Sequence, residues 1–317
     1  WKPYRIVYHA NGGNGWALNE ENPSDLSQEY TVDEDVADAA QTTDKSLART
    51  GYILNYWSTN ANGSGNRYNP GQTYKRFAST LNQNLWTLET VGEGEASKKV
   101  YTLNLYASWA RNGYTISYQN MSGARNGDGN PASYQVESAD VVLSDATKTG
   151  YKFAGWYSTA DQADAAVDAY KTYKKGQNSP EGRVTEINAS NVEMLEDLTR
   201  ASGTRRYINL YPAWVPVTYT LRYHSNFGND QVKDVVYEYG INAKYADDAT
   251  FTNTGYSLNR WNTRADGSGS NYYPNRDFRN MTDTDENVID LYAQWNTIRY
   301  TITYDLRNGD SNGRNNT

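Results

Sequence analysis

The chain has 317 residues, a formal net charge of −7 and no cysteine. Without cysteine there are no disulfide bonds, thiolate metal sites or thiol nucleophiles. Acidic and basic residues are interspersed and form no basic tract, which argues against nucleic-acid binding. No apolar run approaches the roughly 20 residues that a membrane-spanning helix requires. Because 29 Tyr and 9 Trp supply much of the apolar area, we expect small domains with aromatic-centred cores.

An opening element of the form Tyr-x-aliphatic-x-Tyr occurs four times, at 4–8, 114–118, 219–223 and 300–304. A two-residue period places Tyr114, Ile116 and Tyr118 on one face of a strand. Turns rich in glycine and asparagine follow this element, and such residues favour a hairpin connection. The sequence therefore predicts a second strand near Tyr30, Tyr134 and residues 235–239.

A second landmark is a Gly-Tyr pair, at 51–52, 150–151 and 255–256, with a tryptophan six residues after each glycine. We interpret this element as a third strand in which the tyrosine and the tryptophan (Trp57, Trp156 or Trp261) point to opposite sides. Tight Gly-Ser-Gly turns then follow at 62–65 and 266–269. The second copy replaces this turn with an insertion at 161–170 that is rich in alanine and aspartate.

The closing landmark is Leu-Tyr-x-x-Trp, at 105–109, 210–214 and 291–295. Alternation places Leu103, Leu105, Ala107 and Trp109 on one face of a closing strand, with the tyrosines of the motif on the other. Helix is a minor component. Ser190–Glu193 resembles a capping box that opens a short amphipathic helix with Met194, Leu195 and Leu198. Leu81, Leu85 and Leu88 suggest another helix, and 31–34 could cap a third.

Landmarks in a fixed order, at a period of roughly 80–110 residues, indicate tandem domains. Residues 1–3 are expected to be the tail of a preceding repeat, and short linkers such as 110–113 predict an extended, semi-rigid array. The predicted repeats are 4–109, with an insertion near 77–100; 114–214, with insertions near 161–170 and 177–206; 219–295, the shortest; and 300–317, the start of an incomplete fourth. The fold class is mainly β with minor α.

These landmarks resemble the internalin-type B repeat, also called the Listeria–Bacteroides repeat, of bacterial surface proteins. The best matches are residues 150–156, 265–269 and 291–295, and the resemblance covers nearly the whole chain. The resemblance implies small β-grasp-like domains in a cell-surface or secreted bacterial protein, and it implies no catalytic residues. The insertions depart from the family, whose repeats are closer in length to the third copy.

Candidate sites favour structural explanations. His9 and His224 both follow an opening strand, and we interpret them as polar strand-end residues rather than catalytic or metal-binding groups. The turns at 60–66 and 266–271 lack the carboxylate run of a calcium loop. Acidic clusters at 33–35 and 283–286 are expected to be solvated surface rather than a glycosidase pair. We therefore expect no catalytic, metal or cofactor site.

Aromatic residues offer the remaining binding candidates. The recurrent tryptophans are expected to serve packing, whereas Trp16 and Trp86 occur in the first copy alone. An aromatic side chain that the shared fold does not require is a better candidate for an interface, although packing of the local insertion is the competing explanation. The second group of candidates is the outward tyrosines of the closing strands, Tyr106, Tyr211 and Tyr292.

The leading hypothesis is a non-enzymatic stalk or spacer of a bacterial surface adhesin, located outside the cell and partnered by its own neighbouring repeats. The alternative is a module that binds a host protein or glycan through the copy-specific insertions. An enzyme is the third reading, and it lacks a visible acid–base pair. Lys–Asn crosslinks occur in some bacterial surface domains, but the sequence does not pair any lysine with an asparagine.

Overall fold

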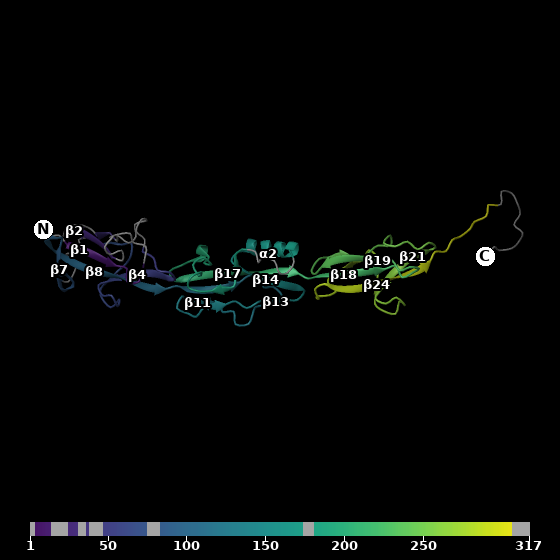
Figure 1. Ribbon diagram of the computed structural model, residues 1–317, viewed down its shortest axis with the longest axis horizontal. Helices are drawn as coiled ribbons and strands as arrows, with labels where there is room; N and C mark the ends of the chain where they lie inside the picture. Colours follow the sequence, from purple (N-terminus) through teal and green to yellow (C-terminus); the bar gives the residue numbers. More distant parts are fainter. Residues whose placement is uncertain are drawn as a thin grey trace. The chain divides into compact units, whose positions relative to one another are not determined.

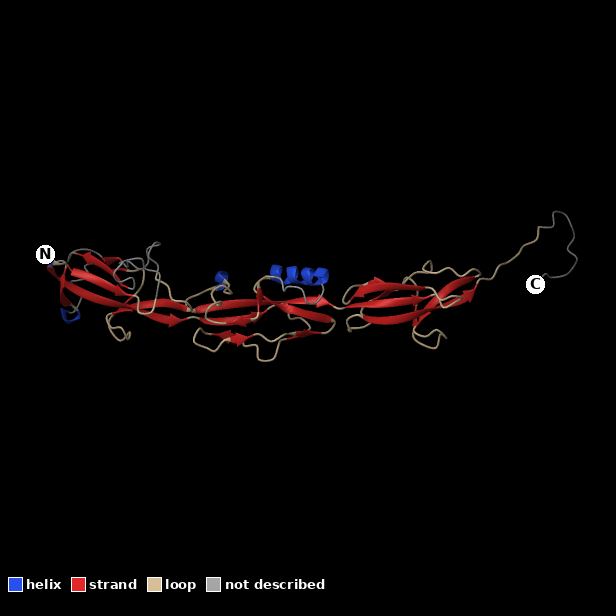
Figure 2. Cartoon of the chain, in the orientation of Figure 1, coloured by secondary structure: helices blue, strands red, loops and turns tan. Residues whose placement is uncertain are grey.

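A computed structural model describes residues 4–13, 25–30, 36–37, 47–74, 83–173 and 181–305. The chain divides into two compact units, Trp1–Ala146 with Ala154–Ala213, and Thr147–Phe153 with Trp214–Thr317. Across the described residues the fold is mainly β, with a single α-helix (Figures 1 and 2). This agrees with the fold class that the sequence predicts.

The first copy is built on a mixed sheet in the order β2-β1-β8-β4-β5, with β7 also paired to β8. The opening strand β1 is antiparallel to β2 and parallel to the closing strand β8. Its elements are β1 (Tyr4–His9), β2 (Asp25–Tyr30), β3 (Val36–Ala37), β4 (Tyr52–Ser58), β5 (Arg67–Tyr68), β6 (Thr73–Tyr74), the 3-10 helix η2 (Gln83–Leu85), β7 (Thr87–Val91), the 3-10 helix η3 (Gly94–Ala96) and β8 (Lys98–Arg111).

The second copy repeats this plan, because its opening strand β9 lies between β11 and the parallel closing strand β17, and β14 lies beside β17. Its elements are β9 (Gly113–Tyr118), β10 (Ala124–Arg125), β11 (Ser133–Tyr134), β12 (Val141–Val142), β13 (Thr147–Lys148), β14 (Tyr151–Tyr157), α2 (Ala160–Tyr173), β15 (Arg183–Val184), β16 (Glu186–Ile187), the 3-10 helix η4 (Leu198–Arg200) and β17 (Arg205–Pro216).

The third copy is the simplest, with a five-stranded sheet in the order β19-β18-β24-β21-β22. Its opening strand β18 is again parallel to the closing strand β24 and antiparallel to β19. Its elements are β18 (Thr218–His224), β19 (Val232–Glu238), β20 (Ala243–Lys244), β21 (Tyr256–Asn262), β22 (Asn271–Tyr272), β23 (Asp277–Phe278) and β24 (Asn287–Thr297). The predicted strands of all three copies are therefore confirmed.

The core of each copy is an aromatic pair that joins the opening strand to the Gly-Tyr strand. The second tyrosine of the opening motif meets the recurrent tryptophan edge to face, with ring centroids 4.9 Å apart for Tyr8–Trp57, 5.1 Å for Tyr118–Trp156 and 4.7 Å for Tyr223–Trp261. All three tryptophans are buried. Such pairs contribute on the order of 1 kcal/mol beyond the area that they bury. The predicted packing role of these tryptophans follows directly.

The indole N–H groups of the landmark tryptophans are also satisfied inside each copy. Trp109 and Trp295 donate to the carbonyls of Ala10 and Ser225, at 3.1 and 2.8 Å, and so hold the loop after the opening strand. Trp156 and Trp261 donate to the carbonyls of Ser144 and Ala246, at 3.0 and 2.9 Å. An indole N–H that is shielded from water requires such a partner, which explains why these four tryptophans lie opposite a loop carbonyl.

The one long helix, α2, was not predicted, and it occupies the place of the Gly-Ser-Gly turn. Thr159 caps its start by accepting a hydrogen bond from the N–H of Gln162, at 3.2 Å. Ala163 and Ala166 are buried against the side chains of Tyr157 and Ala213. In the first and third copies, polar residues stand at the positions of Tyr157 and Ala213. The apolar character of these two positions in the second copy was the sequence signal for α2.

The predicted helix after Ser190 is wrong. Residues 189–195 form turns, and Asn188 rather than Ser190 caps them by accepting hydrogen bonds from the N–H groups of Ser190 and Asn191. Met194 and Leu198 are strongly exposed, so no apolar helix face forms. The helix predicted over Leu85 and Leu88 is also wrong, since these residues lie in η2 and β7. Leu81 and the cap at 31–34 lie outside the described residues.

Candidate functional site

A polar residue at the end of each opening strand faces the closing strand. His9 Nε2 lies 2.8 Å from Asn104 Oδ1, and in the second copy Gln119 Nε2 donates to Asn209 Oδ1 at 3.1 Å. In the third copy the partner on the closing strand is an acid, and His224 Nε2 lies 2.9 Å from Asp290 Oδ1. The parallel register of the opening and closing strands brings these pairs together in every copy.

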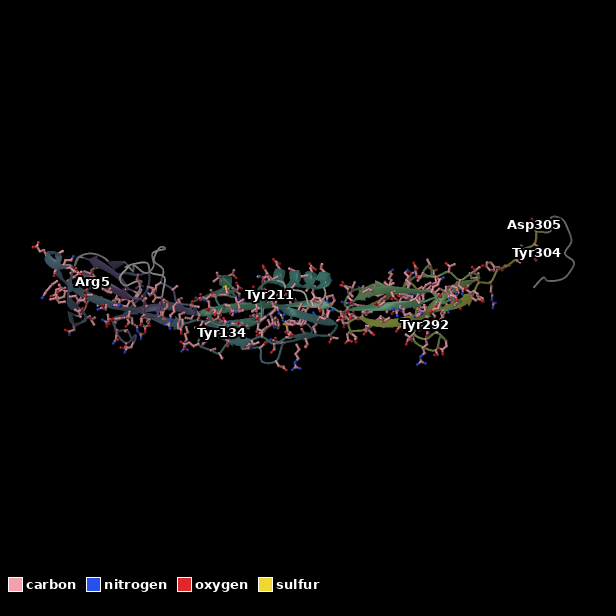
Figure 3. The ribbon with its side chains drawn as sticks, viewed as in Figure 1. Arg5, Tyr134, Tyr211, Tyr292, Tyr304 and Asp305 are labelled. Carbon is pink, nitrogen blue, oxygen red and sulfur yellow. The ribbon has the colours of Figure 1, made fainter. Side chains whose placement is uncertain are left out.

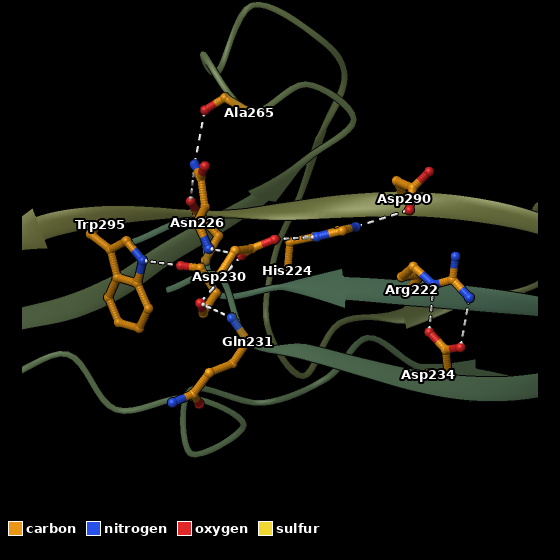
Figure 4. Close-up of polar contacts among 11 residues, drawn as sticks. Arg222, His224, Asn226, Asp230, Gln231, Asp234, Ala265, Asp290 and Trp295 are labelled. Atoms are coloured by element: carbon orange, nitrogen blue, oxygen red, sulfur yellow. Dashed lines mark hydrogen bonds and ion pairs between the residues drawn. The ribbon is translucent and has the colours of Figure 1, made fainter. Parts of the chain in front are cut away.

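His224 is the most elaborate of these positions (Figure 4). Its second ring nitrogen, Nδ1, lies 2.6 Å from Asp230 Oδ2 in the loop between β18 and β19. Its ring also stacks on Tyr292 with centroids 4.4 Å apart. Because both ring nitrogens face carboxylates, the protonated imidazolium can donate to both at once.

Electrostatics of this cluster favour a charged histidine. Burial alone lowers the pKa of His224, but the hydrogen bonds to Asp290 and Asp230 outweigh it, so the net pKa is raised. Burial raises the pKa of Asp230, yet the bonds from His224 and the backbone outweigh it and leave the pKa lowered. The adjacent Arg222 and Asp234 form a two-pronged ion pair, with both contacts at 2.9 Å. The result is a small charge network on the outer face of the third sheet.

This arrangement anchors the loop that follows β18. Ser225 Oγ donates to Asp230 at 3.3 Å and accepts from the N–H of Gln231 at 2.8 Å. Next to it, Asn226 donates to the carbonyls of Ala265 and Ala293 and ties the Gly-Ser-Gly turn to β24 (Figure 4). Within the described ranges, no group of three or more His, Cys, Asp or Glu residues could hold a metal ion.

The predicted binding aromatics are half-buried against partners within their own copy. Trp86 meets Tyr4 edge to face at 5.1 Å, and Tyr106 stacks on His9 at 4.4 Å, as Tyr292 does on His224. Tyr211 packs against the cluster that holds α2 (Figure 3). Trp16 lies outside the described residues. A ligand-binding role for these five residues therefore stays a prediction.

Sequence reasoning missed a different set of contacts, which we name the first joint. Here Gly51, Tyr52 and Arg111 of the first copy meet Val136, Glu137 and Glu193 of the second. Glu137 accepts from the Tyr52 hydroxyl and, at 2.7 Å, from Arg111, while Glu193 accepts from the Gly51 N–H at 2.8 Å. The hydrogen bond to Glu137 is the main reason why the pKa of Tyr52 is raised.

Gly51 fits the first joint because it has no side chain. Its φ is +75°, and a Cβ there would lie 2.0 Å from Cγ1 of Val136. The linking residue Asn112 is only 4% exposed, and its N–H donates to the Gly51 carbonyl at 2.8 Å. The predicted linker at 110–113 is therefore packed chain.

The second joint lies within the second compact unit and repeats this design with other residues. Gly150 has a φ of +76°, and a Cβ there would lie 2.3 Å from the Tyr239 ring. Tyr151 meets the same ring edge to face at 5.7 Å, and Lys152 Nζ lies 2.7 Å from Asp285 Oδ2. Its linking residue, Val217, is 4% exposed; its N–H donates to Gly150 and its carbonyl accepts from Tyr239, both at 2.9 Å.

The same corner of the third copy is uncovered, and we call it the open end: Gly255, Tyr256 and Ile298. The Ile298 N–H still donates to the Gly255 carbonyl at 2.8 Å, so the corner is formed. However, no atom of the described residues lies within 4 Å of a Cβ at Gly255, and Tyr256 and Ile298 are 43% and 42% exposed. Beyond it, Tyr300, Ile302 and Tyr304 are exposed and form no strand. Tyr304 is labelled in Figure 3.

A sequence signal for the joints exists in hindsight. Val136 and Tyr239 each stand two residues after the tyrosine that pairs with the opening strand, Tyr134 or Tyr237. The first copy has Val32 at this spacing after Tyr30. At Val136 and Tyr239, an apolar residue just beyond a strand end indicates a contact outside the repeat's own sheet.

The copy-specific insertions make hydrogen bonds and ion pairs with the rest of the fold. The segment before β17 carries Glu193, which reaches the first joint, and Glu196, which pairs with Arg206 at 2.8 Å. Burial raises the pKa of Glu196 against the opposing effect of Arg206. In the first copy, β7 pairs with β8, and its Glu89 forms an ion pair with Arg5. Exposed apolar side chains nevertheless remain on both insertions, at Leu88, Met194 and Leu198.

Comparison with known families decides the classification. The model of the Listeria-Bacteroides repeat domain matches residues 4–81, 114–178 and 219–294. The chain belongs to this family. The matched segments begin at the three opening strands, and each spans the opening strand, its antiparallel partner and the Gly-Tyr strand.

Similar individual proteins are much longer than this chain. A predicted Gly-rich membrane protein of Evansella cellulosilytica is 22% identical over 263 residues, which cover 83% of this chain and 23% of that protein. A predicted membrane protein of the same organism is 24% identical over 195 residues, covering 60% of this chain and 23% of that protein. In the described part of the chain, no helix has the length and apolar character needed to cross a membrane.

One solved structure has a weak likeness. The pilus adhesin SpaC from Lactobacillus rhamnosus GG is 10% identical, with a TM-score of 0.17, and the match covers 94% of this chain and 44% of the adhesin. A TM-score this low carries no argument about the fold.

Proposed function

We propose that this chain is a non-enzymatic stalk segment of a bacterial surface adhesin, in which β-grasp-like repeats act as semi-rigid spacers. One observation carries the proposal: the linking residues Asn112 and Val217 are both 4% exposed, and both are hydrogen-bonded to the glycine of the preceding corner. A free linker would leave neighbouring repeats mobile, whereas packed joints limit their motion. The parallel opening and closing strands at the centre of each sheet support the β-grasp-like description.

The family and the relatives support the proposed location. Repeats of this family occur in surface proteins, and the two relatives are described as membrane proteins. We place this segment outside the cell, where a chain without cysteine needs another source of stiffness. The ion pairs and buried linkers of the joints supply it.

Small-angle X-ray scattering of the intact chain tests the stalk. We expect a maximum dimension close to that of three repeats placed end to end, unchanged between low and physiological salt. A compact particle, with repeats folded back on each other, would contradict the proposal. The Lys152→Ala variant serves as a matched control, because it weakens the second joint without touching a core.

A binding module is the second candidate, favoured by the exposed apolar side chains on the insertions. Leu88 lies on β7, and Met194 and Leu198 lie in the segment before β17. Exposed apolar side chains on copy-specific segments are common at interfaces. A screen against host proteins and glycans should therefore compare the intact chain with Leu88→Ser and with Met194→Ser/Leu198→Ser. Val142→Ser, at another exposed apolar residue, is the control. Equal binding by all four chains would rule out recognition through the insertions.

A further inference from the structure

The open end of the third copy has the geometry of the covered joints but no cover. Its glycine has a φ of +83°, close to the +75° of Gly51 and the +76° of Gly150. The hydrogen bond from the linking residue to this glycine is present in all three copies, at 2.8–2.9 Å. Positive φ at a conserved place in each repeat is the backbone requirement of a corner, and it is met here without a neighbour.

The linking residue distinguishes two kinds of cover. Where it is the polar Asn112, the cover combines Val136 with two carboxylates, Glu137 and Glu193. Where it is the apolar Val217, the cover is the aromatic ring of Tyr239, which lies over Gly150 and meets Tyr151. Ile298 is apolar and branched like Val217, so the open end belongs to the second kind.

We propose that the open end is a docking site for another repeat of this family in the same chain, opened by residues 300–304. The repeat that it fits places an aromatic side chain two residues after its second-strand tyrosine. That ring would lie over Gly255 and against Tyr256, and the N–H of the same residue would donate to the Ile298 carbonyl, as Tyr239 does to Val217. The exposed apolar surface of Tyr300 and Ile302 supports this occupant, because the opening strands of the other copies bury these positions.

This inference deepens the stalk proposal and rests on it. The chain has no cysteine, so a single introduced thiol reports burial at one chosen position. The experiment compares thiol-labelling rates in Asn112→Cys, Val217→Cys and Ile298→Cys chains. We expect labelling at 112 and 217 to be at least tenfold slower than at 298. Equal rates at all three positions would contradict the stalk proposal itself, since its joints would then be open.

The decisive chain replaces residues 300–317 of Ile298→Cys with an added copy of residues 219–299. We expect labelling at position 298 to slow at least tenfold and to recover when Tyr239→Ser is introduced in the added copy. Circular dichroism and tryptophan fluorescence confirm that the added copy is folded in both chains. Unchanged labelling beside a folded added copy would overturn the docking site while leaving the stalk intact.

Other occupants give different results. If a second chain filled the open end, labelling of the unextended Ile298→Cys chain would slow as protein concentration rises. Such a dependence would overturn the proposal in favour of association between chains. Labelling that is fast and independent of concentration in the unextended chain, and slow in the extended one, supports docking within one chain.

Discussion

The first and second joints and the open end share a backbone corner, yet only the joints are covered, and the difference shows what a neighbour contributes. At Gly51 and Gly150 the corner is packed by Val136 or Tyr239, and the linking residue is 4% exposed. At Gly255 the same corner forms with Ile298 42% exposed. Each repeat therefore builds its own corner, whereas the burial of the linker comes from the next repeat.

Replacing the corner glycines with alanine should have the largest effect on stability. It should distinguish the corner that each repeat builds itself from the burial that the next repeat adds. Gly150→Ala adds a Cβ at positive φ, and this Cβ overlaps the Tyr239 ring. We therefore expect the free energy of unfolding to fall by about 2–4 kcal/mol. Gly51→Ala should behave alike because of Val136. Gly255→Ala suffers the backbone strain alone, about 1 kcal/mol. Urea unfolding measures all three, and equal losses would show that the joints add nothing at these glycines.

Removal of Glu196 should weaken the first joint through the insertion that carries Glu193. Glu196→Ala leaves the largely buried Arg206 without its ion-pair partner, and we expect a loss of about 2 kcal/mol in the free energy of unfolding. Hydrogen exchange should then quicken in the segment before β17 and at Gly51. The second joint is the internal control, because its cover comes from the third copy. Faster exchange at Gly150 to the same degree would contradict the assignment.

The Lys152–Asp285 pair tests the second joint more gently. Asp285 also accepts from the Thr218 N–H at 3.1 Å, so Asp285→Ala removes two contacts, and we expect a loss of about 1–2 kcal/mol. Asp285→Asn retains an acceptor for Thr218 and should lose only about 0.5 kcal/mol. Salt screens only the ion pair, and both variants lack it. The difference between their free energies of unfolding should therefore change little at high salt. Unfolding curves at two salt concentrations provide the measurement.

The His224 cluster, at the far end of β18 from the second joint, should give the smallest effect. The folded pKa of His224 is raised, so its contribution is complete below the unfolded value of about 6.5 and is lost as pH rises through the folded value. The pKa of Asp230 is lowered, so its contribution is lost as pH falls below its unfolded value of about 3.9. Between these two pH limits we expect the cluster to stabilise the third copy by about 0.5–1 kcal/mol.

Asp290→Asn is the matched variant for this cluster, because it reproduces the uncharged partner that His9 and Gln119 have in Asn104 and Asn209. It should flatten the pH dependence of exchange in β18 and β24 without changing the labelling of Val217→Cys. A pH dependence that survives in Asp290→Asn and in His224→Gln would assign it to other groups.

The sequence alone determined the repeat, its strands and the faces of those strands, because these follow from local periodicity and turn chemistry. Tyr114 and Ile116 are buried as the two-residue alternation predicts, and Trp57, Trp156 and Trp261 are buried in keeping with their expected packing role. Local reasoning failed where a segment's partner lies far along the chain. Residues 190–198 have a helical pattern, but Asn188 and the contacts of Glu193 and Glu196 draw them into turns. The Ala-rich 161–170 segment forms α2 because the buried side chains of Tyr157 and Ala213 give it an apolar surface to pack against.

Tertiary structure alone decided the joints and the contacts that raise the pKa of His224. Gly51 and Val136 are separated by a whole repeat in sequence, and no periodicity links them. Asp230 and Asp290 likewise come from a loop and a distant strand, and only the parallel register of β18 and β24 brings them to one imidazole. Alternation along a strand specifies which side chains turn inward, whereas contacts between repeats depend on where separate sheets place their ends.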